Sequence, residues 1–140
     1  MQHAEHVIRT WFSEAWNKGN IEAAYRDFMH PDAVFHTVGQ QGEKLVGLAG
    51  FRSLFDPVQA AFSDINFTVQ EVIEAGDAAA VRWTCTGRHT GDQMGIAASG
   101  KTVAFGGNTI VHFKDGKITE SFDQWDRLGF LTQTGVLPAR

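Results

Sequence analysis

Apolar residues in the first part of the chain recur at the spacing of an amphipathic helix. Between His3 and Lys18 they fall every three or four positions, at Val7, Ile8, Trp11, Phe12 and Ala15. Gly19 follows where the end of a helix is commonly capped, and Asn20 can cap a second helix over residues 21–29. The pattern therefore predicts two consecutive helices.

The next segment predicts a short strand and a third helix. His30-Pro31-Asp32 ends the second helix, and residues 34–38 form an apolar run typical of a strand. Gly47 and Gly50 open a stretch whose apolar residues fit one helical face: Leu48, Phe51, Leu54, Phe55, Val58, Ala61 and Phe62. Pro57 is expected to kink this helix or to begin a new turn.

Beyond Asp64 the pattern changes to the two-residue alternation of β-strands. The predicted strands are residues 65–74, 78–89, 102–113 and 117–125, and a short closing helix is expected over residues 127–135. Four strands in sequence predict a strongly curved antiparallel sheet, whose apolar face the N-terminal helices must cover. We therefore predict one α+β domain over residues 1–140, with a cone between helices and sheet that can hold a small ligand.

Asp115-Gly116 is the strongest hairpin signal in the chain, because a type I′ turn needs positive φ at both central positions. Such a turn places Phe113 opposite Ile118 and Asn108 opposite Asp123. Unless a bulge intervenes, the Asp123 carboxylate is then expected to lie beside the Asn108 amide on one face of the sheet.

Composition excludes several classes of function. The net charge is −4 and lysines and arginines do not cluster, which argues against a nucleic-acid or anionic-membrane surface. The apolar runs are too short to span a bilayer, and the first residues lack the basic flank of a signal peptide. We therefore expect a cytoplasmic protein with no membrane or nucleic-acid partner.

Neither cysteine nor histidine spacing indicates a metal site. The single cysteine, Cys85, excludes an internal disulfide and is expected to be a small buried apolar residue. The six histidines lack the helical i, i+4 pairing or the cysteine partners of zinc sites. No metal is therefore expected.

Several short motifs resemble one known family. They are Asp115-Gly116-Lys117-Ile118 followed by an acidic strand and residues 126–135, Gly87-Arg88-His89-Thr90-Gly91, Trp16-Asn17-Lys18-Gly19 with His30-Pro31-Asp32, and Ala61-Phe62-Ser63-Asp64. Together they cover nearly the whole chain, which is similar to SnoaL-like polyketide cyclases, also called ester cyclases. The resemblance implies the cone of the NTF2-like superfamily.

The same resemblance implies an activity. In these cyclases a carboxylate removes a proton next to a carbonyl group of a polyketide ester, and the enolate attacks a second carbonyl without any cofactor. The position of the family's catalytic Asp corresponds to Asp123. The family also crowds histidine and glutamine around that residue, whereas this chain has Gly107, Thr109 and Ser121 in the corresponding strands.

Chemistry at Asp123 is consistent with that role but leaves an alternative open. An apolar setting would raise its pKa toward neutrality and suit it to acid-base work. The second requirement is a hydrogen-bond donor for an enolate oxygen, and the candidates are Asn108, His36, His89, Trp16 and Trp83. Trp16, Trp83 and Met94 are expected at the cavity wall. Asp123 could instead be an edge-strand carboxylate bonded to a loop.

Two functional hypotheses follow from these residues. The first is a cofactor-independent enzyme of the cyclase or isomerase type, which acts on a small hydrophobic carbonyl compound with Asp123 as general base. The second is a non-catalytic module that binds a small hydrophobic ligand or serves for dimerisation. A homodimer is expected in either case.

Overall fold

A computed structural model describes residues 2–37 and 44–138 of the chain. The elements of this part are α1 (Gln2–Trp11), the π-helical segment η1 (Phe12–Asn17), α2 (Ile21–Phe28), β1 (Met29–His36), β2 (Lys44–Val46), α3 (Gly47–Ala61), β3 (Phe62–Ala75), β4 (Ala78–His89), β5 (Thr102–Lys114), β6 (Lys117–Trp125) and α4 (Arg127–Gln133). The predicted α+β class is confirmed.

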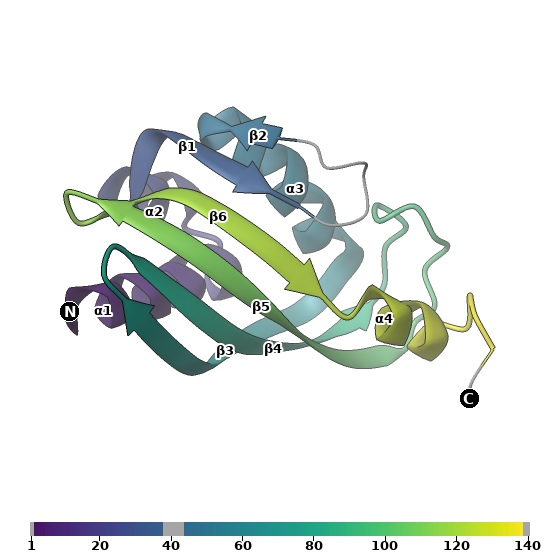
Figure 1. The fold of residues 1–140 in the computed structure, drawn as a ribbon. Helices are drawn as coiled ribbons and strands as arrows, with labels where there is room; N and C mark the ends of the chain where they lie inside the picture. Colours follow the sequence, from purple (N-terminus) through teal and green to yellow (C-terminus); the bar gives the residue numbers. More distant parts are fainter. Residues whose placement is uncertain (1, 38–43, 139–140) are drawn as a thin grey trace.

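The strands form one six-stranded sheet in the order β2-β1-β6-β5-β4-β3 (Figure 1). All neighbouring pairs are antiparallel except β1 and β6, which run parallel. The four consecutive strands predicted from the sequence, β3 to β6, are antiparallel as expected, whereas the parallel pairing of β1 with β6 was not predicted. No hairpin joins β1 to β6, so no tight turn forces the two strands into opposite directions.

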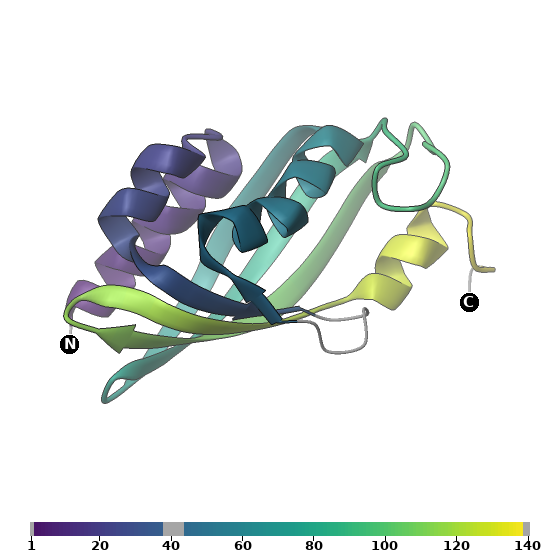
Figure 2. The same cartoon turned by 90° about the horizontal axis from the view of Figure 1, so that it is seen from above.

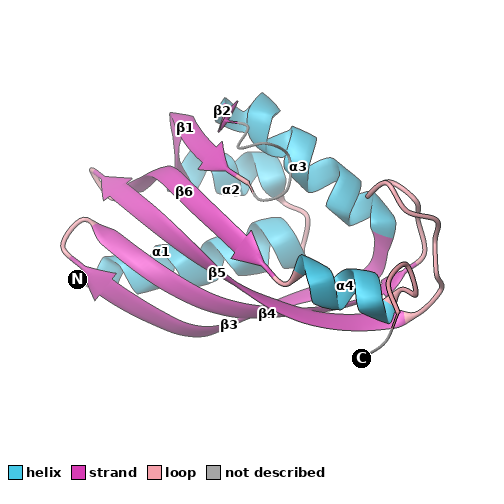
Figure 3. Cartoon of the chain, turned by 45° about the vertical axis from the view of Figure 1, so that its right-hand side comes forward, coloured by secondary structure: helices cyan, strands magenta, loops and turns pink. Residues whose placement is uncertain are grey.

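Helices α1, α2 and α3 lie against the concave face of the sheet, and α4 lies at one end beside the loop that joins β4 to β5 (Figures 2 and 3). The main core lies between these layers, and the α1–η1 stripe predicted from the sequence is buried in it. None of the helices in the described residues is long and apolar enough to span a bilayer.

Most predicted boundaries agree with the structure. The bounds of β4 and β6 are those expected, and Cys85 is buried as expected. The helix α3 is continuous through Pro57, so no new helix begins there. The strand β1 is longer than predicted at its start, and Val38, the last residue of the predicted strand, lies outside the described residues.

A β-bulge corrects the predicted register of the hairpin. Asp115 and Gly116 both have positive φ, and Phe113 pairs with Ile118, as predicted. The pairing then shifts between Phe113 and His112, so one extra residue is accommodated in β6. Beyond this bulge Asp123 lies opposite Thr109. Because neighbouring residues of a strand point to opposite faces, the predicted partner Asn108 points away from Asp123.

The first predicted helix changes type halfway along. Its second half, η1, is a π-helical turn in which the Lys18 amide donates to the Ser13 carbonyl at 3.0 Å, five residues back. In a regular α-helix, residues five apart point about 140° away from each other. The wider π-turn brings Trp11 and Trp16 to the same side, where both line one cavity.

Candidate active site

The concave side of the sheet and the helices enclose a cavity of about 540 Å³. Its wall is largely aromatic and aliphatic, with side chains from α1, η1, α3 and all six strands of the sheet. Met94 and its neighbours in the loop after β4 complete the wall near α4. Among the described residues that line it, only Asp123 and Arg127 carry a charge, so the Asp123 carboxylate lies in a mainly apolar space.

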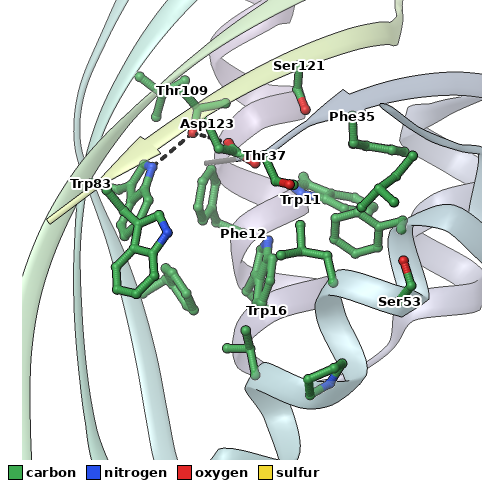
Figure 4. A pocket seen from close by; sticks show the side chains of 18 of the residues that line it. Trp11, Phe12, Trp16, Phe35, Thr37, Ser53, Trp83, Thr109, Ser121 and Asp123 are labelled. Carbon is green, nitrogen blue, oxygen red and sulfur yellow. Dashed lines mark hydrogen bonds between the residues drawn. The ribbon is translucent and has the colours of Figure 1, made fainter. Parts of the chain in front are cut away.

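Asp123 is half-buried on β6, and one of its oxygens is held by a short chain of hydrogen bonds (Figure 4). The Thr109 hydroxyl donates to Asp123 Oδ1 at 2.7 Å, and the Trp83 indole Nε1–H donates to Thr109 Oγ1 at 3.0 Å. An indole N–H can only donate, so the single hydroxyl hydrogen of Thr109 is directed to Asp123. Oδ2 is then the oxygen left for a ligand.

Gly107 makes this chain of hydrogen bonds possible. Trp83 on β4 pairs directly with Gly107 on β5, and its indole reaches along β5 to Thr109. A Cβ at position 107 would collide with the Trp83 ring and with the Gln124 carbonyl oxygen. The glycine therefore leaves the space through which Trp83 contacts Thr109.

Burial raises the pKa of Asp123 from an ordinary 3.8 to about 6, while the hydrogen bond from Thr109 acts in the opposite direction. The cause is the cost of keeping a charge away from bulk water, which the Thr109 hydroxyl reduces by donating to the ionised form. A carboxyl group with this pKa is largely ionised at pH 7 and can still hold a proton, as a general acid-base group must.

Three of the predicted ligand contacts, Trp16, Trp83 and Met94, lie in the cavity wall. Asn108 is exposed on the outer face of the sheet, because it alternates along β5 with Thr109, which faces the cavity; the bulge in β6 turns Asp123 to the inner face. His36 lies on the same outer face, where its ring stacks on Phe122 at 4.3 Å. The structure therefore does not bring Asn108 or His36 to the candidate site.

His89 is fully buried, but it does not line the cavity. Its Nδ1 accepts a hydrogen bond from the Ser99 backbone N–H at 3.1 Å, and its ring packs against Phe62 and Phe130. Burial lowers the pKa of His89, which favours the neutral ring that this contact requires. His89 thus fastens the end of the loop after β4 rather than contacting a ligand in the cavity.

Sequence reasoning missed several polar groups in the wall. Thr109 and Ser121 were noted in the corresponding strands, but Thr109 could be placed beside Asp123 only with the bulge included. Thr37, Ser53 and Arg127 also line the cavity and gave no recognisable signal in the sequence. No three His, Cys, Asp or Glu side chains among the described residues are grouped so that they could hold a metal ion.

Comparisons with known proteins agree with this fold. A candidate polyketide cyclase from Acidithiobacillus ferrooxidans is 30% identical over 94% of each chain, with a TM-score of 0.81. IdmH, a candidate polyketide cyclase from Streptomyces antibioticus, is 27% identical over 96% of this chain and 99% of its own, with a TM-score of 0.80.

A Catenulispora acidiphila protein with a ketosteroid isomerase-like fold is 18% identical over 92% of each chain, with a TM-score of 0.75. The domain thus has the NTF2-like, ketosteroid isomerase-like fold. No curated protein matched the sequence. The family model for SnoaL-like polyketide cyclases matches residues 6–134, nearly the whole chain, and the protein therefore belongs to the SnoaL-like polyketide cyclase family.

Proposed function

We propose that this protein is a cofactor-independent enzyme that performs acid-base chemistry on a small, hydrophobic carbonyl compound, as a polyketide cyclase does. The observation that carries the proposal is the state of Asp123, whose pKa is raised to about 6 in an apolar cavity. One carboxylate oxygen is held by Thr109 and the other is free for a substrate.

In the proposed reaction, Asp123 Oδ2 takes a proton from the carbon next to a carbonyl group. The electron pair of the broken C–H bond forms an enolate, which attacks a second carbonyl of the same molecule and makes a C–C bond. The proton held on Asp123 then neutralises the new alkoxide, so the carboxylate is regenerated and no redox partner is needed. The similar proteins named as candidate polyketide cyclases support a polyketide-like substrate.

The proton-removal step can be tested with a simple ketone. We expect the protein to accelerate deuterium uptake into the methyl group of 2-acetylnaphthalene in D2O, followed by proton NMR. The rate should rise with pH through about 6, because only the ionised carboxylate accepts a proton. Asp123→Asn should reduce the acceleration by about a hundredfold or more.

Asp126→Asn is the matched control. This neighbouring carboxylate caps α4, where its Oδ1 accepts from the Gly129 N–H at 2.8 Å, and it does not line the cavity. An asparagine can also cap a helix, so the control should keep the wild-type rate. Equal exchange rates for Asp123→Asn and the wild type would favour the non-catalytic ligand-binding alternative.

Thr109→Val should raise the pKa of Asp123 above its value of about 6. The substitution removes the hydroxyl that stabilises the ionised carboxylate but keeps the size of the side chain. Thr109→Ser, which retains a hydroxyl, should stay close to wild type. A carboxyl-carbon NMR titration measures both variants, and an unchanged pKa in Thr109→Val would show that this hydrogen bond has no effect on ionisation.

The raised pKa also predicts a pH-dependent stability difference. The folded carboxyl, with a pKa of about 6, holds its proton more tightly than an unfolded one at ~3.9, so its stabilising contribution is complete below pH ~4 and disappears as the pH rises through about 6. From pH 5 to pH 8, the free energy of unfolding of Asp123→Asn, measured by urea denaturation, should increase by about 1.4 kcal/mol relative to that of the wild type. A constant difference across this range would contradict the raised pKa.

We further propose that the protein forms a homodimer through the outer face of its sheet. Strand pairing aligns Ile73, Ala80, Ile110, Phe122 and His36 in one row across five strands of that face. The three large apolar members of this outer row are exposed. An exposed apolar strip on the face of the sheet opposite the helices supports association with a second copy.

Ile110→Lys should convert the dimer into a monomer, because it places a charge in the middle of the outer row. Light scattering coupled to size-exclusion chromatography reports the mass. Val136→Lys is the matched control, since Val136 is equally exposed but lies after α4 and away from the sheet. A wild-type protein that elutes with the mass of one chain would contradict the proposed dimer.

A further inference from the structure

The indole N–H groups of the tryptophans indicate that the cavity has a second functional group besides the Asp123 carboxylate. All four tryptophans line it, and an indole N–H can only donate a hydrogen bond. Trp83 donates to Thr109. The other three, Trp11, Trp16 and Trp125, have no acceptor for their N–H among the described residues. Their Nε1 atoms are not sealed from solvent, because the only fully buried unpaired side-chain polar atom in the described chain is His89 Nε2.

The backbone of Trp16 is held firmly on the helical wall. Gln59 donates its side-chain amide to the Trp16 carbonyl at 3.0 Å. The next residue, Asn17, is bonded twice to the Phe67 backbone, donating at 2.9 Å and accepting at 2.6 Å. These contacts fix the π-turn, and with it the direction in which the Trp16 side chain leaves the helix.

The ring of Trp16 is fixed as well. It packs against Phe51, Phe55 and Phe67, with ring centroids 5.6, 5.0 and 4.9 Å away. Figure 4 shows its nitrogen-bearing edge turned into the cavity, toward the side where Asp123 and Thr37 lie. The indole therefore offers one directed donor in apolar surroundings, where an unsatisfied donor is costly.

Trp16 lies on the helical wall, whereas Asp123 lies on the sheet wall. A ligand between them would meet a proton acceptor on one side and a hydrogen-bond donor on the other. Enolisation requires this pair, because negative charge develops on the carbonyl oxygen as the α-proton leaves. Trp125 lies on the same strand and face as Asp123, so it does not lie across a ligand from the carboxylate. Trp11 lies on the helical wall like Trp16, so the variant Trp11→Phe is needed to distinguish the two indoles.

We propose that the indole N–H of Trp16 binds the carbonyl oxygen of the substrate and stabilises the enolate formed when Asp123 Oδ2 removes the α-proton. The indole keeps its proton throughout, and the electron pair of the broken C–H bond is delocalised onto the bound oxygen. The enolate part of this assignment rests on the proposed function, whereas the binding of a carbonyl oxygen does not.

Ketone binding tests the assignment without any turnover. We compare 2-acetylnaphthalene with 2-ethylnaphthalene, which has a similar shape but no carbonyl group. The wild type should bind the ketone about three- to tenfold more tightly than the hydrocarbon, as expected for one net hydrogen bond. Trp16→Phe should remove this preference, whereas the matched variant Trp11→Phe, which deletes an indole from the same cavity, should keep it.

Infrared spectroscopy of the bound ketone, labelled with carbon-13 at the carbonyl, gives a readout that altered packing alone would not produce. The stretching frequency should be lower in the wild type and in Trp11→Phe than in Trp16→Phe. Nitrogen-15 NMR of the wild type, with indole signals assigned from Trp11→Phe, Trp83→Phe and Trp125→Phe, remains decisive if Trp16→Phe does not fold. The ketone should shift the Trp16 indole signal most.

The assignment is overturned if the wild type binds the ketone no better than the hydrocarbon, or if Trp11→Phe rather than Trp16→Phe removes the preference. The deuterium-exchange assay separates this failure from failure of the proposed function. Exchange that depends on Asp123 but not on Trp16 would retain the enzyme and remove the donor. A Trp16-dependent carbonyl shift without exchange would retain the donor and remove the enzyme.

Discussion

An ionisable group in an apolar cavity is the constraint around which this domain is arranged. Asp123 lies among aromatic side chains, and without a hydrogen-bond partner there its carboxyl group would hold a proton more tightly. The hydroxyl of Thr109 reduces that cost, and Trp83 reduces the freedom of the hydroxyl. The glycine at position 107 leaves room for the indole. Four residues on three strands therefore position one atom, Oδ1 of Asp123.

This arrangement has the features expected of a functional site that is maintained at the expense of stability. A neutral residue at position 123 would fit the cavity with a smaller desolvation cost, whereas the carboxyl contributes less and less to folding as the solution becomes less acidic. The large aromatic core supplies the stabilisation that offsets this cost. Retaining the acid under those conditions is more readily understood as a chemical than as a structural requirement.

The sequence was most informative where a local rule determines the structure. Two-residue alternation and the Asp-Gly turn gave β4, β6 and the tip of the hairpin, since each depends on residues close together in the chain. The bulge in β6 and the π-turn before Asn20 depend on packing across the domain, and no local sequence pattern predicts them. Asn108 and Asp123 were therefore assigned to the same face of the sheet. His36 was misplaced because its orientation follows from parallel pairing with β6, which joins distant parts of the chain.

Each wall of the cavity contains one additional residue that sets the direction of its side chains. On the sheet wall it is in the bulge of β6, and on the helical wall it is in the π-turn of η1. Each addition leaves its secondary-structure element intact but rotates every side chain that follows it. The spacing between residues is consequently as informative about the site as their identity. An alignment with a relative that lacks the bulge would match Asp123 to a residue on the other face of the sheet. One with a relative that lacks the π-turn would match Trp16 to a residue about 100° further around the helix, even where the surrounding letters agree.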